Sequence, residues 1–222
     1  MDRMSGFLQH LGAPITVDEL LEGRPLVVLA PHPDDETLGC GALLVDAAAQ
    51  GASCSVICVT DGSRSHPKST KWPAERLAKE RRRELEAAVA ILGATMHWLG
   101  HRDCQVQMDA DISPLIPQDA LLLATWEGDP HVDHQSVAQL AQKMARPDVM
   151  LAYYPIWGRF TNLTARARPI VASSAARAAK RRALACHRSQ MTPLIDDDPE
   201  GFVMEAWRQE HFLMHPEIII AA

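Results

Sequence analysis

An alternation of short apolar runs with longer helical patterns constrains the fold of this chain most strongly. Apolar, β-branched runs predict strands at residues 25–30, 53–60, 96–99, 121–126, 149–154 and 217–220. Helices are predicted at residues 37–50, 73–92, 132–144, 172–187 and 202–212, after a helical lead-in within residues 1–24 that has Phe7, Leu8 and Leu11 on one side. Strands that alternate with helices imply parallel crossovers. The sequence therefore predicts the α/β class, with a doubly wound, mostly parallel sheet flanked by helices.

The length and composition narrow the class of protein further. The 222 residues contain no repeat, low-complexity segment or linker, so we predict one domain over residues 1–222. A net charge of -6 gives no electrostatic case for a nucleic-acid or anionic-membrane partner. Five scattered cysteines indicate a reducing compartment rather than a disulfide framework. No apolar leader and no stretch of membrane-spanning length is visible, so we expect a cytoplasmic location.

A histidine and three carboxylates follow directly after the first predicted strand, in the run Pro-His-Pro-Asp-Asp-Glu at residues 31–36. Open α/β sheets bind ligands beyond the carboxyl ends of their strands, which is where this run lies. The two prolines stiffen the loop. Carboxylates crowded together are costly unless a cation lies among them, and a metal ion is the simplest such cation. Asp35 is also a candidate N-cap for the helix predicted from Thr37.

This run resembles the signature of the PIG-L or LmbE-like family of zinc-dependent deacetylases, which act on N-acetylglucosamine-type sugars. Three other blocks match the family in the same order. Residues 130–134 resemble its H-x-D-H element, and residues 187–190 resemble its H-x-S-Q element. A third block matches its R-x-x-E-x-x-x-A-x-x-x-L-G helix through Arg81, Glu84, Ala88, Leu92 and Gly93. The resemblance implies a Rossmann-like fold and an amide hydrolase.

The resemblance also implies a role for each matched residue. It gives His32, Asp35 and His134 as the ligands of a zinc ion, a donor set that would also accept Fe(II). A zinc-bound water would attack the amide, with Asp34 as general base. His131 is the candidate for stabilising the oxyanion, and Asp133 is expected to orient His131. Whether Asp34 or His131 protonates the leaving amine stays open.

Five further residues are candidates for binding the substrate. Arg81 is expected to reach the pocket from its helix, and Asp61 and Ser63 follow the second strand. Gln190 could close the pocket from the C-terminal side. Asp129 stands near the place where some family members carry a substrate-binding tyrosine. A second departure is Gly39-Cys40-Gly41-Ala42, where the family often has G-x-G-G.

The leading hypothesis is a hydrolase that removes an acetyl or short acyl group from an N-acetylated amino sugar or glycoconjugate. One alternative keeps the metal and the mechanism but acts on a non-sugar amide, such as a thiol or antibiotic conjugate. Another is a non-catalytic sugar- or metal-binding module. A nucleotide-binding domain is disfavoured because neither G-x-G-x-x-G nor a P-loop follows the first strand. The expected partner is a small-molecule amide, and a homo-oligomer is expected only by analogy with hydrolases of this fold.

Overall fold

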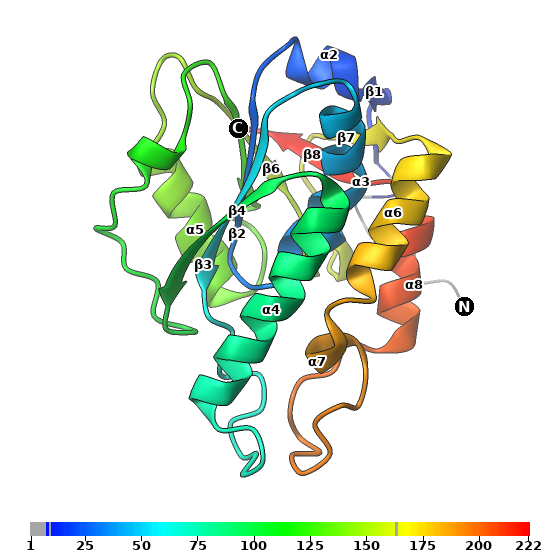
Figure 1. Cartoon of the computed structure of the whole chain (residues 1–222). Helices are drawn as coiled ribbons and strands as arrows, with labels where there is room; N and C mark the ends of the chain where they lie inside the picture. Colours follow the sequence, from blue (N-terminus) through cyan, green and yellow to red (C-terminus); the bar gives the residue numbers. More distant parts are fainter. Residues whose placement is uncertain (1–7, 9, 163) are drawn as a thin grey trace.

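The computed structural model describes residue 8 and residues 10–162 and 164–222. Its strands form one eight-stranded sheet in the order β1-β7-β8-β6-β5-β2-β3-β4 (Figure 1). The strands are β1 (Ile15–Thr16), β2 (Leu26–Ala30), β3 (Cys54–Thr60), β4 (Thr95–His101), β5 (Leu121–Thr125), β6 (Met150–Tyr154), β7 (Ala167–Val171) and β8 (Ile218–Ala221). The helices are α2 (Val17–Leu21), α3 (Asp35–Ala49), α4 (Ala74–Leu92), α5 (Val132–Lys143), α6 (Ser174–Leu184), α7 (Arg188–Met191) and α8 (Ala206–Met214), with short 3-10 turns η1 (Ser113–Leu115) and η2 (Trp157–Phe160).

The sheet is mostly parallel and its strand order reverses at β2. From β2 the chain adds β3 and β4 on one side and later β5 and β6 on the other, with parallel pairing throughout. Of the described strands, only β8 runs antiparallel to its neighbours, β6 and β7. A reversal of strand order leaves a crevice at the carboxyl ends of the two central strands, β2 and β5. The predicted α/β class and its mostly parallel sheet are confirmed.

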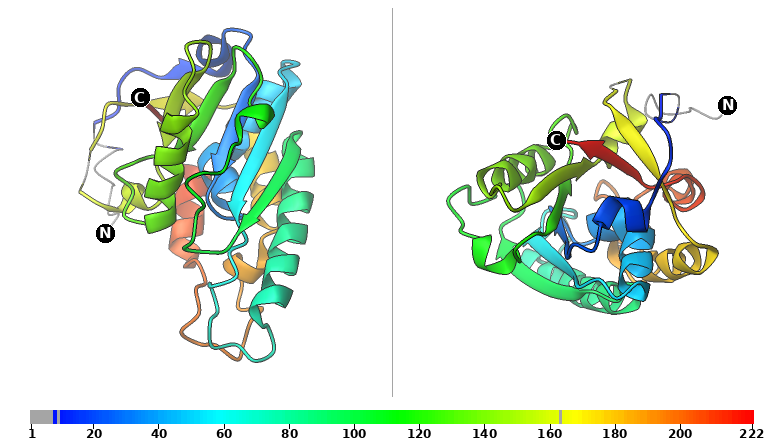
Figure 2. Two further views of the ribbon diagram at one scale, coloured as in Figure 1. Left: turned by 90° about the vertical axis from the view of Figure 1, so that its left-hand side faces the viewer. Right: turned by 90° about the horizontal axis from the view of Figure 1, so that it is seen from above.

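Two apolar layers sandwich the sheet. Alternate residues of β2 face opposite layers, since Val28 packs with one core cluster and Val27 with the other. All five β2 residues are fully buried, as expected for a central parallel strand covered on both faces. Helices α3, α4 and α6 cover one face and α5 covers the other (Figure 2). Among the described residues, none of the helices has the length and apolar character that a membrane crossing requires.

Some predicted boundaries need correction. Helix α3 begins at Asp35, so its N-cap residue is Asp34 and Asp35 is not the cap. The helix predicted at residues 172–187 ends at Leu184, and α7 starts separately at Arg188. Residues 202–205 are not helical, because α8 starts only at Ala206. Strands β1 and β7 were not predicted. In the lead-in, Leu8 and Leu11 pack against one core cluster, and Phe7 lies outside the described residues.

Candidate active site

The loop at residues 31–36 holds its acidic side chains in a strained, buried arrangement. Asp34 has a φ of 142°, a conformation that is costly for a residue with a Cβ atom. Its backbone N–H donates to Oε2 of Glu36 at 3.0 Å. Its carboxylate accepts from Nη2 of Arg81 at 3.3 Å. Strain of this kind persists only where surrounding contacts enforce it, and it is frequent at functional sites.

Arg81 makes several of the contacts that hold this loop in its strained conformation. It projects from the buried stripe of α4, is 3% exposed, and donates to the carbonyl oxygens of Pro33 at 2.8 Å and Gly62 at 2.9 Å. Gly62 has a φ of 60°, and a Cβ atom there would lie 2.5 Å from Cζ of Arg81. Arg81 does line the pocket, as predicted from its helix. Its hydrogen bonds, however, go to the loop that carries Asp34 and to Gly62.

The three predicted metal ligands converge at the end of β2. The Oδ2 atom of Asp35 lies 3.2 Å from Nδ1 of His32 and 3.3 Å from Nε2 of His134. Two donors of one tetrahedral zinc ion, with bonds of about 2.0–2.1 Å, are about 3.3 Å apart. His134 is fully buried, and neither of its ring nitrogens makes a well-oriented hydrogen bond. A buried imidazole whose Nε2 lies beside a carboxylate without a well-oriented hydrogen bond fits a metal ligand, so this donor set suits a metal ion.

Other donor combinations also lie close to His32. His131 and His134 each bring one donor atom within 4.8 Å of His32 and of each other, as do Asp103 and Asp133. The second group surrounds the opposite ring nitrogen, since Nε2 of His32 lies 3.0 Å from Asp133 and 3.4 Å from Asp103. Carboxylates on the far nitrogen of a ligating histidine commonly fix its tautomer and orientation. Asp129 does the same for His134, with Oδ1 at 3.1 Å from Nδ1.

The expected pairing of Asp133 with His131 through its carboxylate is wrong. The Asp133 carboxylate contacts His32 and accepts the backbone N–H of Cys104 at 2.9 Å. His131 is instead the N-cap of α5, where its Nδ1 accepts the backbone N–H of Asp133 at 3.2 Å. That bond assigns the proton of the neutral ring to Nε2. Burial, together with His32 and His134 nearby, lowers the pKa of His131 and favours this neutral form.

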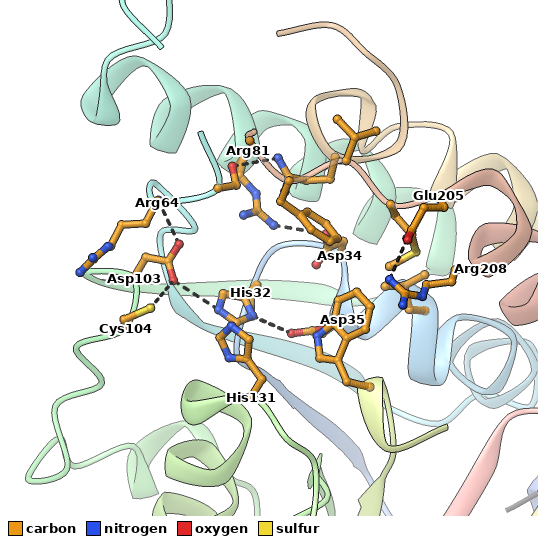
Figure 3. Close-up of a pocket in the computed structure, with 18 of the residues that line it drawn as sticks. His32, Asp34, Asp35, Arg64, Arg81, Asp103, Cys104, His131, Glu205 and Arg208 are labelled. Carbon is orange, nitrogen blue, oxygen red and sulfur yellow. Dashed lines mark hydrogen bonds and ion pairs between the residues drawn. The ribbon is translucent and has the colours of Figure 1, made fainter. Parts of the chain in front are cut away.

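Asp34 has the electrostatics of a general base. Burial raises the pKa of Asp34 to about 7, with Arg81 opposing the shift and Asp35 adding to it. A carboxylate that titrates near neutrality can take a proton and later return it. In Figure 3 Asp34 lies beneath Arg81, and His131 lies next to His32.

These groups open into a pocket of about 730 Å³. Six of the predicted site residues line it: His32, Asp34, Asp35, Arg81, His131 and Gln190. Asp129, Asp133 and His134 lie behind this surface. Asp61 and Ser63 do not line it either. The Oδ1 atom of Asp61 accepts the backbone N–H groups of Ser63 and Asp103 at 3.0 and 3.1 Å. Asp61 thus shapes the loop that carries Asp103.

The sequence interpretation missed several lining residues. Asp103 follows the carboxyl end of β4 and Trp157 follows that of β6, so the strand-end argument applied to residues 31–36 could have found both. Arg64, Phe202 and Arg208 also line the pocket. Phe202 lies in an irregular segment, and no signal in the sequence marks it.

Comparisons with known proteins identify a family and relatives that this chain resembles. The sequence profile of the PIG-L family, described as GlcNAc-PI de-N-acetylase, matches residues 27–145. A 1D-myo-inositol 2-acetamido-2-deoxy-alpha-D-glucopyranoside deacetylase of Nocardioides sp. is 33% identical over 141 residues, 58% of this chain and 46% of the relative. A mycothiol S-conjugate amidase of Streptomyces coelicolor is 28% identical over 135 residues, 58% of this chain and 43% of the relative. The chain thus spans less than half the length of either relative.

The fold also matches a solved structure over most of its length. The N,N'-diacetylchitobiose deacetylase from Pyrococcus horikoshii superposes with a TM-score of 0.69, covering 93% of this chain and 90% of that one. The sequence identity is 20%, so this similarity shows the fold alone.

Proposed function

Since the chain belongs to the PIG-L family of GlcNAc-PI de-N-acetylases, we propose that it is a metal-dependent hydrolase that removes an acetyl or short acyl group from an amino sugar or glycoconjugate. One observation carries the proposal: His32, Asp35 and His134 converge next to a strained carboxylate, Asp34, whose pKa is raised to about 7. The relatives named above act on acetamido sugars or on a conjugate amide, which supports the reaction class.

His32, Asp35 and His134 would hold the metal, zinc or Fe(II). When bound, the ion would polarise the amide carbonyl and lower the pKa of a water molecule. Asp34 accepts the proton that the attacking water loses, because its raised pKa matches that transfer near neutral pH.

The protein's own residues then handle charge and protons. In this proposal the Nε2–H of His131, a residue that lines the pocket, donates to the oxyanion that forms as water adds to the carbonyl carbon. When the C–N bond breaks, the proton held by Asp34 passes to the leaving nitrogen, which gives a carboxylate and a free amine. Arg81 and Glu36 keep Asp34 in position through both transfers. Asp103 and Asp133 hold the ring of His32.

The proposal is tested by the metal content of the purified protein together with amine release from N-acetylglucosamine and its glycosides. We expect about one metal ion per chain and turnover that stops on chelation and returns when metal is restored. Asp34→Asn should keep the metal and lower kcat by about 10²-fold or more, whereas His134→Ala should lose the metal. Asp196→Asn, an exposed carboxylate paired with Lys71, is the matched control. Full turnover by Asp34→Asn, or a protein that binds no metal after reconstitution, would contradict the mechanism.

A further inference from the structure

One part of the pocket surface is apolar and contrasts with the ionisable groups around His32. It consists of Leu38, Trp157, Phe202 and Met204, which we call the apolar wall. Leu38 and Met204 belong to one core cluster, and Trp157 and Phe202 pack against that cluster. The rings of Trp157 and Phe202 meet edge to face at 5.7 Å between centroids. The wall is therefore continuous with the hydrophobic core.

The apolar wall begins next to the proposed metal ligands. Asp129 accepts the backbone N–H groups on both sides of Trp157, those of Ile156 and Gly158, each at 3.0 Å through Oδ2. Its other oxygen lies 3.1 Å from Nδ1 of His134. A single buried carboxylate thus fixes both a proposed ligand and the backbone around Trp157. The apolar wall and the ligands His32 and Asp35 line one pocket, so a substrate whose amide reaches the ligands can extend along this wall.

The segment that carries Phe202 and Met204 is held in place. The N–H of Phe202 donates to the carbonyl oxygen of Ser65 at 2.7 Å, and the N–H of Met204 donates to that of Gln190 at 2.8 Å. Asp197 also accepts the backbone N–H groups of Thr70 and Lys71, at 2.9 and 2.8 Å. The loop between β3 and α4 and the loop between α7 and α8 lie side by side at the lower end of Figure 1. The apolar wall is preformed, which lowers the entropic cost of binding a group against it.

One cation beside the wall, Arg208, has a carboxylate partner. The guanidinium of Arg208 lies 5.4 Å from the ring centroid of Trp157, and its Nη1 pairs with Glu205 at 2.7 Å. Figure 3 shows this pair at the edge of the pocket. Because the cation already has a carboxylate partner, this part of the pocket suits an uncharged group better than an anion.

We propose that the apolar wall binds an uncharged apolar group that the substrate carries next to its amide, as an aglycone or as the acyl chain. This inference rests on the proposed function and narrows its substrate class. Sugar hydroxyls placed against the ring faces of Trp157 and Phe202 would lose water without gaining a hydrogen-bond partner from those faces. An alkyl or aryl group gains about fourfold in affinity for each methylene that is buried. The preferred substrates are therefore amphipathic amides rather than bare N-acetylglucosamine.

The test compares three substrates at equal metal loading: N-acetylglucosamine, its hexyl β-glycoside and N-hexanoylglucosamine. We expect one hexyl-bearing substrate to exceed N-acetylglucosamine in kcat/KM by roughly tenfold or more, mainly through KM. A gain with the hexyl glycoside would identify the bound group as an aglycone, and a gain with N-hexanoylglucosamine would identify it as an acyl chain. Phe202→Ala should reduce that ratio by about fivefold or more. Trp207→Ala is the matched control, because Trp207 is 53% exposed and does not line the pocket.

A binding measurement separates this inference from the proposed function. Calorimetry compares hexyl β-glucosaminide with methyl β-glucosaminide, and N-hexanoylglucosamine with N-acetylglucosamine, without requiring turnover. Amine release with equal kcat/KM for all three substrates would overturn the inference and leave the function standing. A hexyl compound could bind more tightly than its short-chain partner, lose this advantage in Phe202→Ala, and yet release no amine. That result would support the inference about the apolar wall and contradict the proposed function. Equal binding within each pair and no turnover would overturn both.

Discussion

Lys180 and Glu217 form a buried ion pair that is hydrogen-bonded to backbone groups of α3. Their charged atoms are 2.7 Å apart, and both side chains are 4% exposed. Lys180 Nζ also donates to the carbonyl oxygen of Leu38 at 2.7 Å, while Glu217 accepts the backbone N–H groups of Ala42 and Leu43 at 2.8 Å each. In an uninterrupted helix the Leu38 carbonyl would pair with the N–H of Ala42. The pair therefore also binds polar backbone groups within the first half of α3.

We predict that Lys180→Met destabilises the protein by about 3–5 kcal/mol, because it leaves Glu217 buried without its cation. This is a large part of the roughly 5–15 kcal/mol that is typical of a folded domain. The double variant Lys180→Met/Glu217→Leu removes both charges, so no uncompensated charge stays buried. It should be more stable than Lys180→Met alone by about 2 kcal/mol.

Urea denaturation followed by circular dichroism measures these free energies of unfolding for both single variants and the double variant. Arg181→Met is the control on the same helix, since Arg181 and Glu210 form an exposed pair at 3.9 Å. Its cost should stay within about 0.5 kcal/mol. A cost below about 1 kcal/mol for Lys180→Met, or strictly additive effects in the double variant, would refute the reasoning.

Two further predictions concern other buried groups. Burial and Arg159 lower the pKa of His211 to about 3, so the unfolded state binds a proton below about pH 6.5 that the folded state does not. The free energy of unfolding should therefore fall as the pH drops from about 6.5 to about 4, by at most about 1.4 kcal/mol per pH unit from this group, and His211→Gln should flatten the fall in urea titrations. Gly39→Ala should cost about 1–3 kcal/mol in the same assay, since its Cβ atom would lie 2.7 Å from Cε2 of Tyr154. A pH slope unchanged in His211→Gln, or a fully stable Gly39→Ala, would contradict these two predictions.

The central strands could be predicted because each is an apolar run buried on both faces, as β2 shows. Strand β7 gave no such signal. It contains Arg168 and Pro169, and only Ala167 and Ile170 are buried. The split between α6 and α7 could not be predicted either, because a tertiary contact marks it: His187 Nε2 lies 3.1 Å from Glu36, far away in the sequence.

The proposed ligands could be named because a local motif carries two of them. The contact that the Asp133 side chain makes could not be predicted from the closeness of Asp133 to His131 in the sequence. At the start of α5 the side chains of neighbouring residues diverge, and the Asp133 carboxylate reaches His32 instead. Trp157 and Phe202 depend on how β6 and a long irregular segment are placed around α3, which no local pattern encodes.

Some residues of the family motifs supply the proposed metal-donor atoms, and others hold Asp34, the proposed general base, in its strained conformation. Arg81 binds the loop of Asp34 directly. His187 contacts Glu36, whose other oxygen accepts the N–H of Asp34, so the C-terminal block supports the same loop. A backbone conformation such as that of Asp34 costs about 1–3 kcal/mol, and these contacts offset it. If these motif residues serve the proposed reaction, preference among substrates comes from residues outside the motifs, and the apolar wall is our proposed source of it.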